Sequence, residues 1–121
     1  MKTPTPDSPK VSLLSGNEAI ALAARHCGVT LGTGYPGTPS TEIIESFSQL
    51  GGHAQWAPNE KVAAEVALGV AFAKGRALVT MKHVGLNVAS DVLFTIAYSG
   101  VSGGYVIVCA DDPGMASSQN E

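Results

Sequence analysis

The sequence predicts an α/β fold, with a doubly wound, mainly parallel sheet and helices on both of its faces. Apolar residues at helical spacing alternate with short apolar runs along the chain, which is the pattern of repeated helix and strand units. The run Tyr105 to Ala110 is continuously apolar, as in parallel strands that are covered on both faces. At 121 residues the chain is long enough for one domain with a core of its own.

The N-terminal third is expected to hold a tail, a helix, a strand and a loop. Residues 1–11 are rich in proline and polar side chains, so we expect a flexible tail, with the domain itself over residues 12–121. Helix-spaced apolar residues from Ala19 to Cys27 predict a helix that ends at Gly28. A short strand follows at 29–33, and the two prolines and the glycine of residues 35–39 require a loop.

The middle of the chain continues this alternation. Apolar positions from Ile43 to Leu50 predict a second helix, which ends at two consecutive glycines, and residues 53–57 form a weaker candidate strand. Asn59 is a good N-cap for a third helix that runs to about Lys74.

The last part of the chain is predicted to hold two strands and one helix. A buried strand at 77–81 leads into a loop at Lys82 and His83, and a helix from about Leu86 to Tyr98 precedes the final strand. Functional loops of parallel sheets follow the carboxyl ends of the strands, so segments 35–39, 58–60, 82–87 and 111–115 should meet at one edge. This convergence predicts a ligand site there.

The composition excludes several classes of function. Charged residues make up 14% of the chain, against roughly 25% in typical domains, which indicates that part of the surface is interface. The formal charge is −3 without a basic cluster, so no nucleic acid is expected as a partner. No apolar stretch approaches the roughly 20 residues that cross a bilayer, and no signal peptide is present, so we expect a cytoplasmic protein that does not bind a membrane.

The two cysteines, Cys27 and Cys109, stand far apart in the sequence. They are expected to be buried free thiols, and no metal ligands are predicted.

Glu60 is the candidate residue with the clearest chemistry. It stands in the first turn of the predicted third helix, and the alanines and valines that follow would desolvate its carboxyl group. The helix dipole alone favours an acidic residue at this position, so a purely structural role is the alternative. Glu65 lies five residues further on, roughly 140° around the helix, and cannot form a facing acid–base pair with Glu60.

Several runs of residues, in one order along the chain, match a known enzyme family from about Leu14 to the last residue. They resemble the alpha subunit of indolepyruvate ferredoxin oxidoreductase, one of the thiamine diphosphate-dependent 2-oxoacid ferredoxin oxidoreductases. Several runs in the right order are more specific than any one of them. The runs are Gly16–Ala19, Tyr35–Ser40, Asn59-Glu60, Thr80–Asn87, Ala110–Met115 and Ser117–Glu121.

The resemblance implies that this chain is the N-terminal pyrimidine-binding domain of such an enzyme, incomplete at its C-terminus, and that it binds thiamine diphosphate. Glu60 would hydrogen-bond the ring nitrogen of the aminopyrimidine, and His83 would polarise the 2-oxo group or shuttle a proton. Thr38 would hydrogen-bond the substrate carboxylate. The implied cofactor-binding residues are Tyr35, Pro36, Gly37, Glu60, Lys82, Val84, Gly85 and Asn87.

The implied reaction converts indolepyruvate or another aryl 2-oxo acid to the acyl-CoA by oxidative decarboxylation, as in the breakdown of aromatic amino acids. Ferredoxin would accept the electrons, and coenzyme A the acyl group. Mg²⁺, the diphosphate-binding domain and the iron–sulfur (4Fe–4S) clusters would belong to parts of the enzyme absent from this chain. A beta subunit would complete an oligomer in an anaerobic cytoplasm, and the fragment alone would be inactive.

Two other interpretations of the residues remain open. The glycines of residues 32–37 match the dinucleotide fingerprint Gly-x-Gly-x-x-Gly, with Glu60 roughly where a ribose-binding acid would stand. Pro36 and Pro39 oppose it, because they remove N–H donors that a pyrophosphate would need. In the other interpretation the domain is a degenerate scaffold without catalysis, which the presence of Glu60 argues against.

Overall fold

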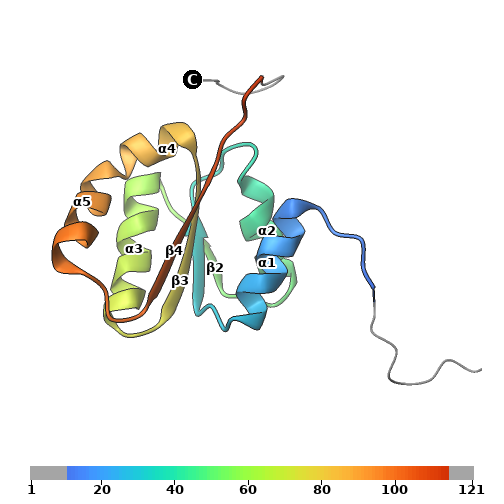
Figure 1. The fold of residues 1–121 in the computed structure, drawn as a ribbon, viewed down its shortest axis with the longest axis horizontal. Helices are drawn as coiled ribbons and strands as arrows, with labels where there is room; N and C mark the ends of the chain where they lie inside the picture. Colours follow the sequence, from blue (N-terminus) through green and yellow to red (C-terminus); the bar gives the residue numbers. More distant parts are fainter. Residues whose placement is uncertain (1–10, 115–121) are drawn as a thin grey trace, which may run out of the picture.

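Four parallel strands form one sheet, in the order β2-β1-β3-β4, in a computed structural model that describes residues 11–114 (Figure 1). Helices alternate with these strands along the chain, which confirms the predicted pattern. The elements are α1 (Gly16–His26), β1 (Leu31–Gly34), α2 (Thr41–Gln49), β2 (Ala54–Trp56), α3 (Glu60–Phe72), β3 (Arg76–Lys82), α4 (His83–Val88), α5 (Ser90–Ser99) and β4 (Gly104–Ala110).

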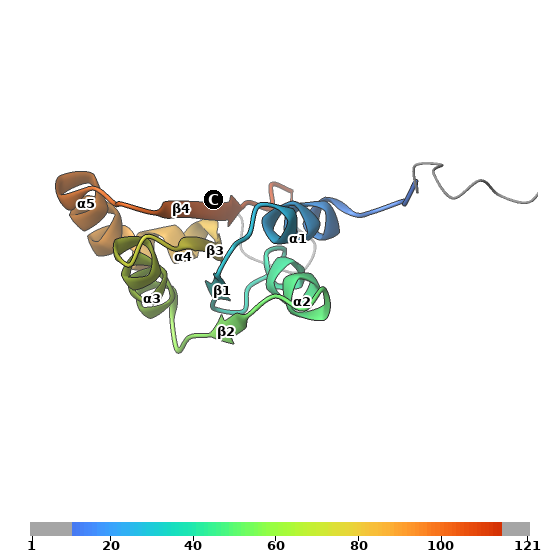
Figure 2. The ribbon, with the colours of Figure 1, turned by 90° about the horizontal axis from the view of Figure 1, so that it is seen from below.

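The sheet is doubly wound and carries helices on both faces (Figure 2). Helices α1 and α2 pack on one face, and α3 and α5 cover the other. Strand β1 pairs with β2 on one side and with β3 on the other, so the chain reverses its direction across the sheet between β2 and β3. The fold class predicted from the sequence is therefore confirmed.

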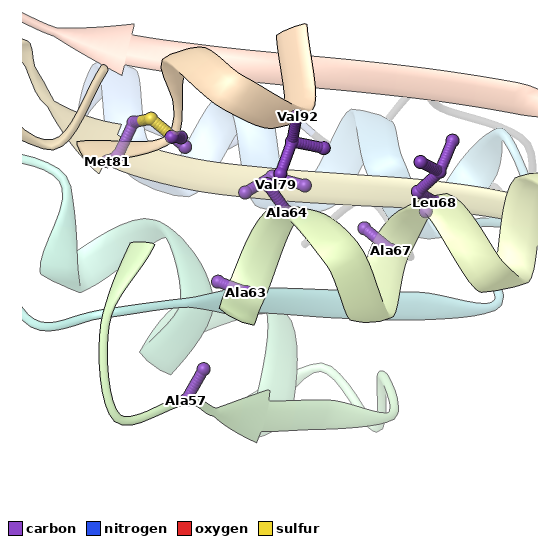
Figure 3. Packing of buried hydrophobic residues seen from close by; sticks show 10 residues of the cluster. Ala57, Ala63, Ala64, Ala67, Leu68, Val79, Met81 and Val92 are labelled. Carbon is purple, nitrogen blue, oxygen red and sulfur yellow. The ribbon is translucent and has the colours of Figure 1, made fainter. Parts of the chain in front are cut away.

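Helix α3 lies close to the sheet because the face that it presents is made of alanine. Ala63, Ala64 and Ala67 are completely buried, and they belong to one cluster with Val79 and Met81 of β3 (Figure 3). Small side chains let the helix backbone approach the strand while still removing apolar surface from water. This packing determines how close the first turn of α3 lies to the carboxyl ends of the strands.

The opposite face of the sheet packs around Phe47 of α2. Phe47 is completely buried and shares a cluster with Ile43 of the same helix and Leu78 of β3. A Cβ atom at Gly32 in β1 would lie 2.9 Å from the ring of Phe47, so only glycine leaves room for this aromatic side chain. Gly32 therefore has a packing role in the strand.

Two helices replace the loop and the single helix that were predicted after β3. The expected loop at Lys82 and His83 is absent because His83 begins α4, and the expected helix from Leu86 to Tyr98 is divided at Ala89. Ala89 has φ −86° and ψ 2°, in the bridge region between the helical and extended basins, which lets the chain turn there. No side chain caps α4 or α5, so the usual sequence signal for a helix start is missing.

Strand β4 is only partly covered, contrary to the prediction from its apolar run. Each of its residues is half-buried or exposed, and Val106 is 55% exposed. Cys27 and Cys109 are exposed free thiols, so their expected burial is also wrong. Within residues 11–114, β4 pairs only with β3, so its outer edge has no neighbouring strand to cover it. The apolar run of β4 therefore does not decide by itself how far the strand is covered.

Some predictions concern residues outside the described range. The expected tail lies almost entirely in residues 1–10, and the last matching run is Ser117–Glu121. Among residues 11–114, no helix combines the length and apolar character needed to cross a membrane.

Candidate functional site

The carboxyl ends of β1 and β3 lie side by side at the point where the sheet changes direction. The segment after β1 leads to α2 on one face, and the segment after β3 leads through α4 to α5 on the other. Ligands of doubly wound sheets bind in the crevice between such diverging segments. The ends of β1, β3 and β4 and the start of α3 gather at one edge of the sheet, at the top of Figure 1, as predicted. This edge is the candidate site.

The segment after β1 is held in place by hydrogen bonds to its own backbone. The hydroxyl group of Ser40 donates to the carbonyl oxygen of Gly37, at 2.8 Å. Asn17, near the start of α1, donates from its amide nitrogen to the carbonyl oxygen of Pro39, at 2.9 Å. Within residues 11–114 the exposed side chain of Thr38 makes no hydrogen bond. The backbone of this segment is thus fixed, while the Thr38 hydroxyl is available to a ligand.

Glu60 occupies the first turn of α3, where the start of the helix is fixed by a cap. The Oδ1 atom of Asn59 accepts a hydrogen bond from the backbone N–H of Val62, at 2.9 Å. Glu60 is half-buried, and its carboxylate has no hydrogen-bond or ion-pair partner among the residues that the structure describes. A Cβ atom at Gly85 would lie 2.8 Å from Oε1 of Glu60, so glycine leaves the space that the carboxylate occupies.

Strand β3 brings two basic side chains to the same edge. Lys82 is its last residue and is only 6% exposed. His83 begins α4, and its Nδ1 atom lies 3.2 Å from Oδ1 of Asp111, which follows β4. This distance is within the range of an ion pair, but neither ring nitrogen forms a well-aligned hydrogen bond. The contact between His83 and Asp111 is therefore a close approach without an aligned hydrogen bond.

The structure brings together two pairs of residues that were predicted to share a site. Glu60 lies against Gly85, and the Cβ atom of Lys82 lies 3.6 Å from where a Cβ atom of Gly37 would stand. The other predicted residues lie in the same two segments, but the structure shows no ligand that would assign them a role. Of these, Val84 is half-buried, and Tyr35, Pro36, Thr38 and Asn87 are exposed.

Two residues of this edge are missing from the predicted site. Asp111 directly follows Ala110, which pairs with Lys82, so its position beside His83 follows from the register of β3 and β4. An acidic residue immediately after an apolar strand was the available signal. Asn17 stabilises the segment after β1 from a distant part of the sequence, and no local pattern indicates that contact.

The geometry does not support the dinucleotide fingerprint. Its first two glycines lie within β1, and a Cβ atom at Gly34 would stand 2.8 Å from the hydroxyl oxygen of Thr80. The third, Gly37, precedes α2, which begins at Thr41. The fingerprint requires its third glycine in the first turn of the helix, close to the pyrophosphate. The glycines in β1 instead allow close packing.

Two surface cavities of the described chain lie away from this edge. One, of about 570 Å³, is bordered by Ile44 of α2 and Trp56 of β2. The other is an apolar groove of about 250 Å³ between α1 and β4. Neither contains a predicted site residue, and no three His, Cys, Asp or Glu side chains within residues 11–114 are grouped as metal ligands. A ligand held by Glu60 would therefore lie outside both of these cavities.

Curated relatives are about half identical to this chain in sequence. The chain is 52% identical over 120 residues to the indolepyruvate oxidoreductase subunit IorA of Archaeoglobus fulgidus, a match that covers 93% of this chain and 19% of that protein. It is 50% identical over 113 residues to IorA of Pyrococcus abyssi, covering 90% of this chain and 17% of the relative. It is also 50% identical over 112 residues to IorA of Methanothermobacter marburgensis, a match that covers 89% of this chain and 18% of that protein. The chain thus spans about a fifth of the length of the curated relatives that it matches.

A solved structure shares the fold. It is a 2-oxoglutarate:ferredoxin oxidoreductase from Magnetococcus marinus, with 2-oxoglutarate, coenzyme A and succinyl-CoA bound. The TM-score is 0.76 at 23% sequence identity, and the match covers 87% of this chain and 19% of that chain. At this identity the likeness shows the α/β fold alone. No protein-family profile matches the chain.

Proposed function

We propose, on the premise that this chain is a homologue of part of the IorA subunit of indolepyruvate oxidoreductase, that it supplies the aminopyrimidine side of a thiamine diphosphate site. Residues 12–121 would form the pyrimidine-binding domain. The complete enzyme would convert indolepyruvate or another aryl 2-oxo acid to the acyl-CoA by oxidative decarboxylation. The sequence identity to IorA over most of the chain supports this proposal.

One observation carries the proposal, namely the unpartnered carboxylate of Glu60. A half-buried carboxyl group at a helix start, without a partner among residues 11–114, is suited to share a proton with a ring nitrogen of a ligand. The absence of a side chain at Gly85 leaves that carboxylate its space. These residues fit the aminopyrimidine ring of thiamine diphosphate. The cofactor, when bound, would supply the nucleophilic carbon that attacks the 2-oxo group.

The other predicted residues would orient the ligands and move a proton. His83 would polarise the 2-oxo group or shuttle a proton, and its Nδ1 atom faces Asp111, which favours one orientation of the ring. The exposed hydroxyl of Thr38 would hydrogen-bond the substrate carboxylate. The cofactor contacts would come from Tyr35, Pro36, Gly37, Val84, Gly85 and Asn87.

The remaining components would come from outside this chain. A diphosphate-binding domain with Mg²⁺, iron–sulfur clusters and a beta subunit would complete the enzyme, with coenzyme A and ferredoxin as the other reactants. The carboxylate of Glu60, without a partner among residues 11–114, supports a site that another domain completes. Oxygen-sensitive clusters would place the assembly in the cytoplasm of an anaerobe that degrades aromatic amino acids.

Titration of the full-length protein with thiamine diphosphate and with NAD tests this function. In the presence of Mg²⁺ we expect saturable binding of thiamine diphosphate, followed by near-ultraviolet circular dichroism, and no binding of NAD at the same concentrations. A preference for NAD would instead support the dinucleotide interpretation. Failure to bind either compound would support a scaffold without catalysis.

A further inference from the structure

Lys82 is enclosed to an extent that is unusual for its charge. It is 6% exposed, although lysine is rarely buried without a partner, because removing an ammonium group from water is costly. Within residues 11–114, Lys82 makes no hydrogen bond and no ion pair. Among the described residues this charge therefore has no partner, and it is available to a ligand.

The position of Lys82 places that missing partner at the candidate site. Side chains alternate along β3, so Lys82 faces the same side of the sheet as Leu78, which packs with α1 and α2. Its Cβ atom lies 3.6 Å from where a Cβ atom of Gly37 would stand. Lys82 is therefore beside the segment that presents Thr38, in the crevice where the segments after β1 and β3 diverge.

The acidic side chains of the adjoining segments have other partners, and the unpartnered Glu60 begins α3, which packs on the opposite face of the sheet. Asp111 lies 3.2 Å from the ring of His83, and Glu42 accepts a hydrogen bond from Asn17 at 3.3 Å. Neither forms an ion pair with Lys82. Among residues 11–114, Lys82 thus has no compensating charge in this crevice, which favours a negatively charged ligand group.

We propose that Lys82 binds the carboxylate of the 2-oxo acid substrate, an inference that rests on the proposed function. A carboxylate accepts a stronger hydrogen bond from an ammonium group than from a neutral hydroxyl, and the enclosure of Lys82 strengthens the attraction between opposite charges. Thr38 adds a second donor from the neighbouring segment. Lys82, which the family resemblance suggested as a cofactor contact, is thereby assigned to the substrate.

The diphosphate of the cofactor is the other anion that could supply this partner. In that case Lys82 would contribute to cofactor affinity and leave the KM for the 2-oxo acid unchanged. A carboxylate from another part of the protein would affect stability alone. The three partners therefore predict different effects of removing the charge.

The test uses the full-length protein assembled with its partner subunits. Lys82→Met removes the charge and retains most of the side-chain volume. We expect the KM for indolepyruvate to rise about 10- to 100-fold and kcat to change by less than about threefold, with unchanged affinity for thiamine diphosphate. A carboxylate inhibitor that resembles the substrate should lose affinity for the variant, whereas its primary amide should bind both proteins equally.

Lys74→Met is the matched control, because Lys74 follows α3 at the opposite end of that helix from Glu60. It should change neither KM nor cofactor affinity. If Lys82→Met does not assemble, Lys82→Gln, which keeps a polar group, replaces it in the same measurements.

An unchanged KM in a variant that binds the cofactor would overturn the assignment of Lys82. A fall in cofactor affinity with unchanged KM, or a fall in thermal stability alone, would also overturn it. Failure of the unaltered enzyme to bind thiamine diphosphate would instead contradict the proposed function, so the two ideas fail separately.

Discussion

A Cβ atom at position 85 would lie 2.6 Å from Cγ of Glu60 and 2.8 Å from Oε1, closer than Cβ atoms approach non-bonded atoms in folded proteins. Gly85→Ala should therefore push the Glu60 carboxylate out of its position. In the full-length protein we expect the affinity for thiamine diphosphate to fall by about tenfold or more, because misplacement by about 1 Å is costly at such sites. Equilibrium titration measures this effect, and circular dichroism checks that the variant is folded.

Gly69→Ala is the matched control for this substitution. Gly69 lies in α3 with nothing within 4 Å of the added carbon, so alanine should stabilise the helix by up to about 1 kcal/mol and leave cofactor affinity unchanged. Equal affinities for the Gly85→Ala and unaltered proteins would show that this carboxylate does not contact the cofactor.

Single residues differ in how far the sequence alone could place them. The position of Glu60 at a helix start was predictable, because Asn59 is a strong cap and alanine favours helix after it. The contact of His83 with Asp111 was not, because it depends on the register between β3 and β4. The burial of Lys82 could not be predicted either, since charged residues at the end of a strand are usually solvated.

The cap of α3 connects the stability of that helix to the site. Asn59→Ala removes the hydrogen bond from the Val62 N–H to the Asn59 side chain. We expect it to lower the free energy of unfolding by about 0.5–2 kcal/mol. It should also weaken thiamine diphosphate binding in the full-length protein, because the first turn of α3 carries Glu60. Urea denaturation and cofactor titration measure the two effects.

Ser15→Ala provides the comparison for loss of a cap. Ser15 accepts a hydrogen bond from the Glu18 N–H at 3.2 Å and forms a capping box at the start of α1. Its loss should destabilise the protein by a similar amount and leave cofactor binding unchanged. If Ser15→Ala and Asn59→Ala weakened binding equally, the effect would reflect general destabilisation rather than the position of Glu60.

Helices were predictable where the spacing of apolar residues agreed with the caps and glycines that mark helix ends. The first three helices have caps or closing glycines, and the structure contains each of them, with ends shifted by a few residues. Helices α4 and α5 lack side-chain caps, and the turn at Ala89 has no proline or glycine to mark it. Their division depends on packing, with Ala89 fully buried, and packing is a tertiary property.

The molecule as a whole leaves apolar surface exposed beside β4. The groove of about 250 Å³ between α1 and β4 is lined by apolar residues, and the chain has only 14% charged residues. The interface that the low charge predicts stays a prediction, and the exposed side chains of β4 are the surface that it would use. The sequence could indicate that such a surface exists, but its location required the strand order.

Tyr105 gives the fold a pH dependence that can be measured. Burial raises the pKa of Tyr105 to about 12 from 10.0, and its hydroxyl group donates a hydrogen bond to the Ala64 carbonyl oxygen at 2.9 Å. A raised pKa means that the folded chain binds this proton more tightly than the unfolded chain does. The contribution of Tyr105 is therefore complete below about pH 10 and is lost as the pH rises toward about 12.

Tyr105→Phe should remove this contribution. At neutral pH we expect a loss of about 0.5–1.5 kcal/mol for the missing hydrogen bond, and the difference in stability from the unaltered chain should shrink above about pH 10. Urea denaturation of both proteins at several alkaline pH values measures that difference. A difference that stays constant across this range would contradict the role assigned to burial of the phenol.

The exchange of the C2 proton of bound thiamine diphosphate with solvent deuterium tests the role of Glu60 most directly. In the full-length enzyme, Glu60→Gln should slow this exchange by about 10²- to 10⁴-fold, because an amide cannot share a proton with the aminopyrimidine as a carboxyl group does. Glu65→Gln, five residues further along α3, should leave the rate unchanged. An unaltered exchange rate in a folded Glu60→Gln enzyme that still binds the cofactor would contradict the account.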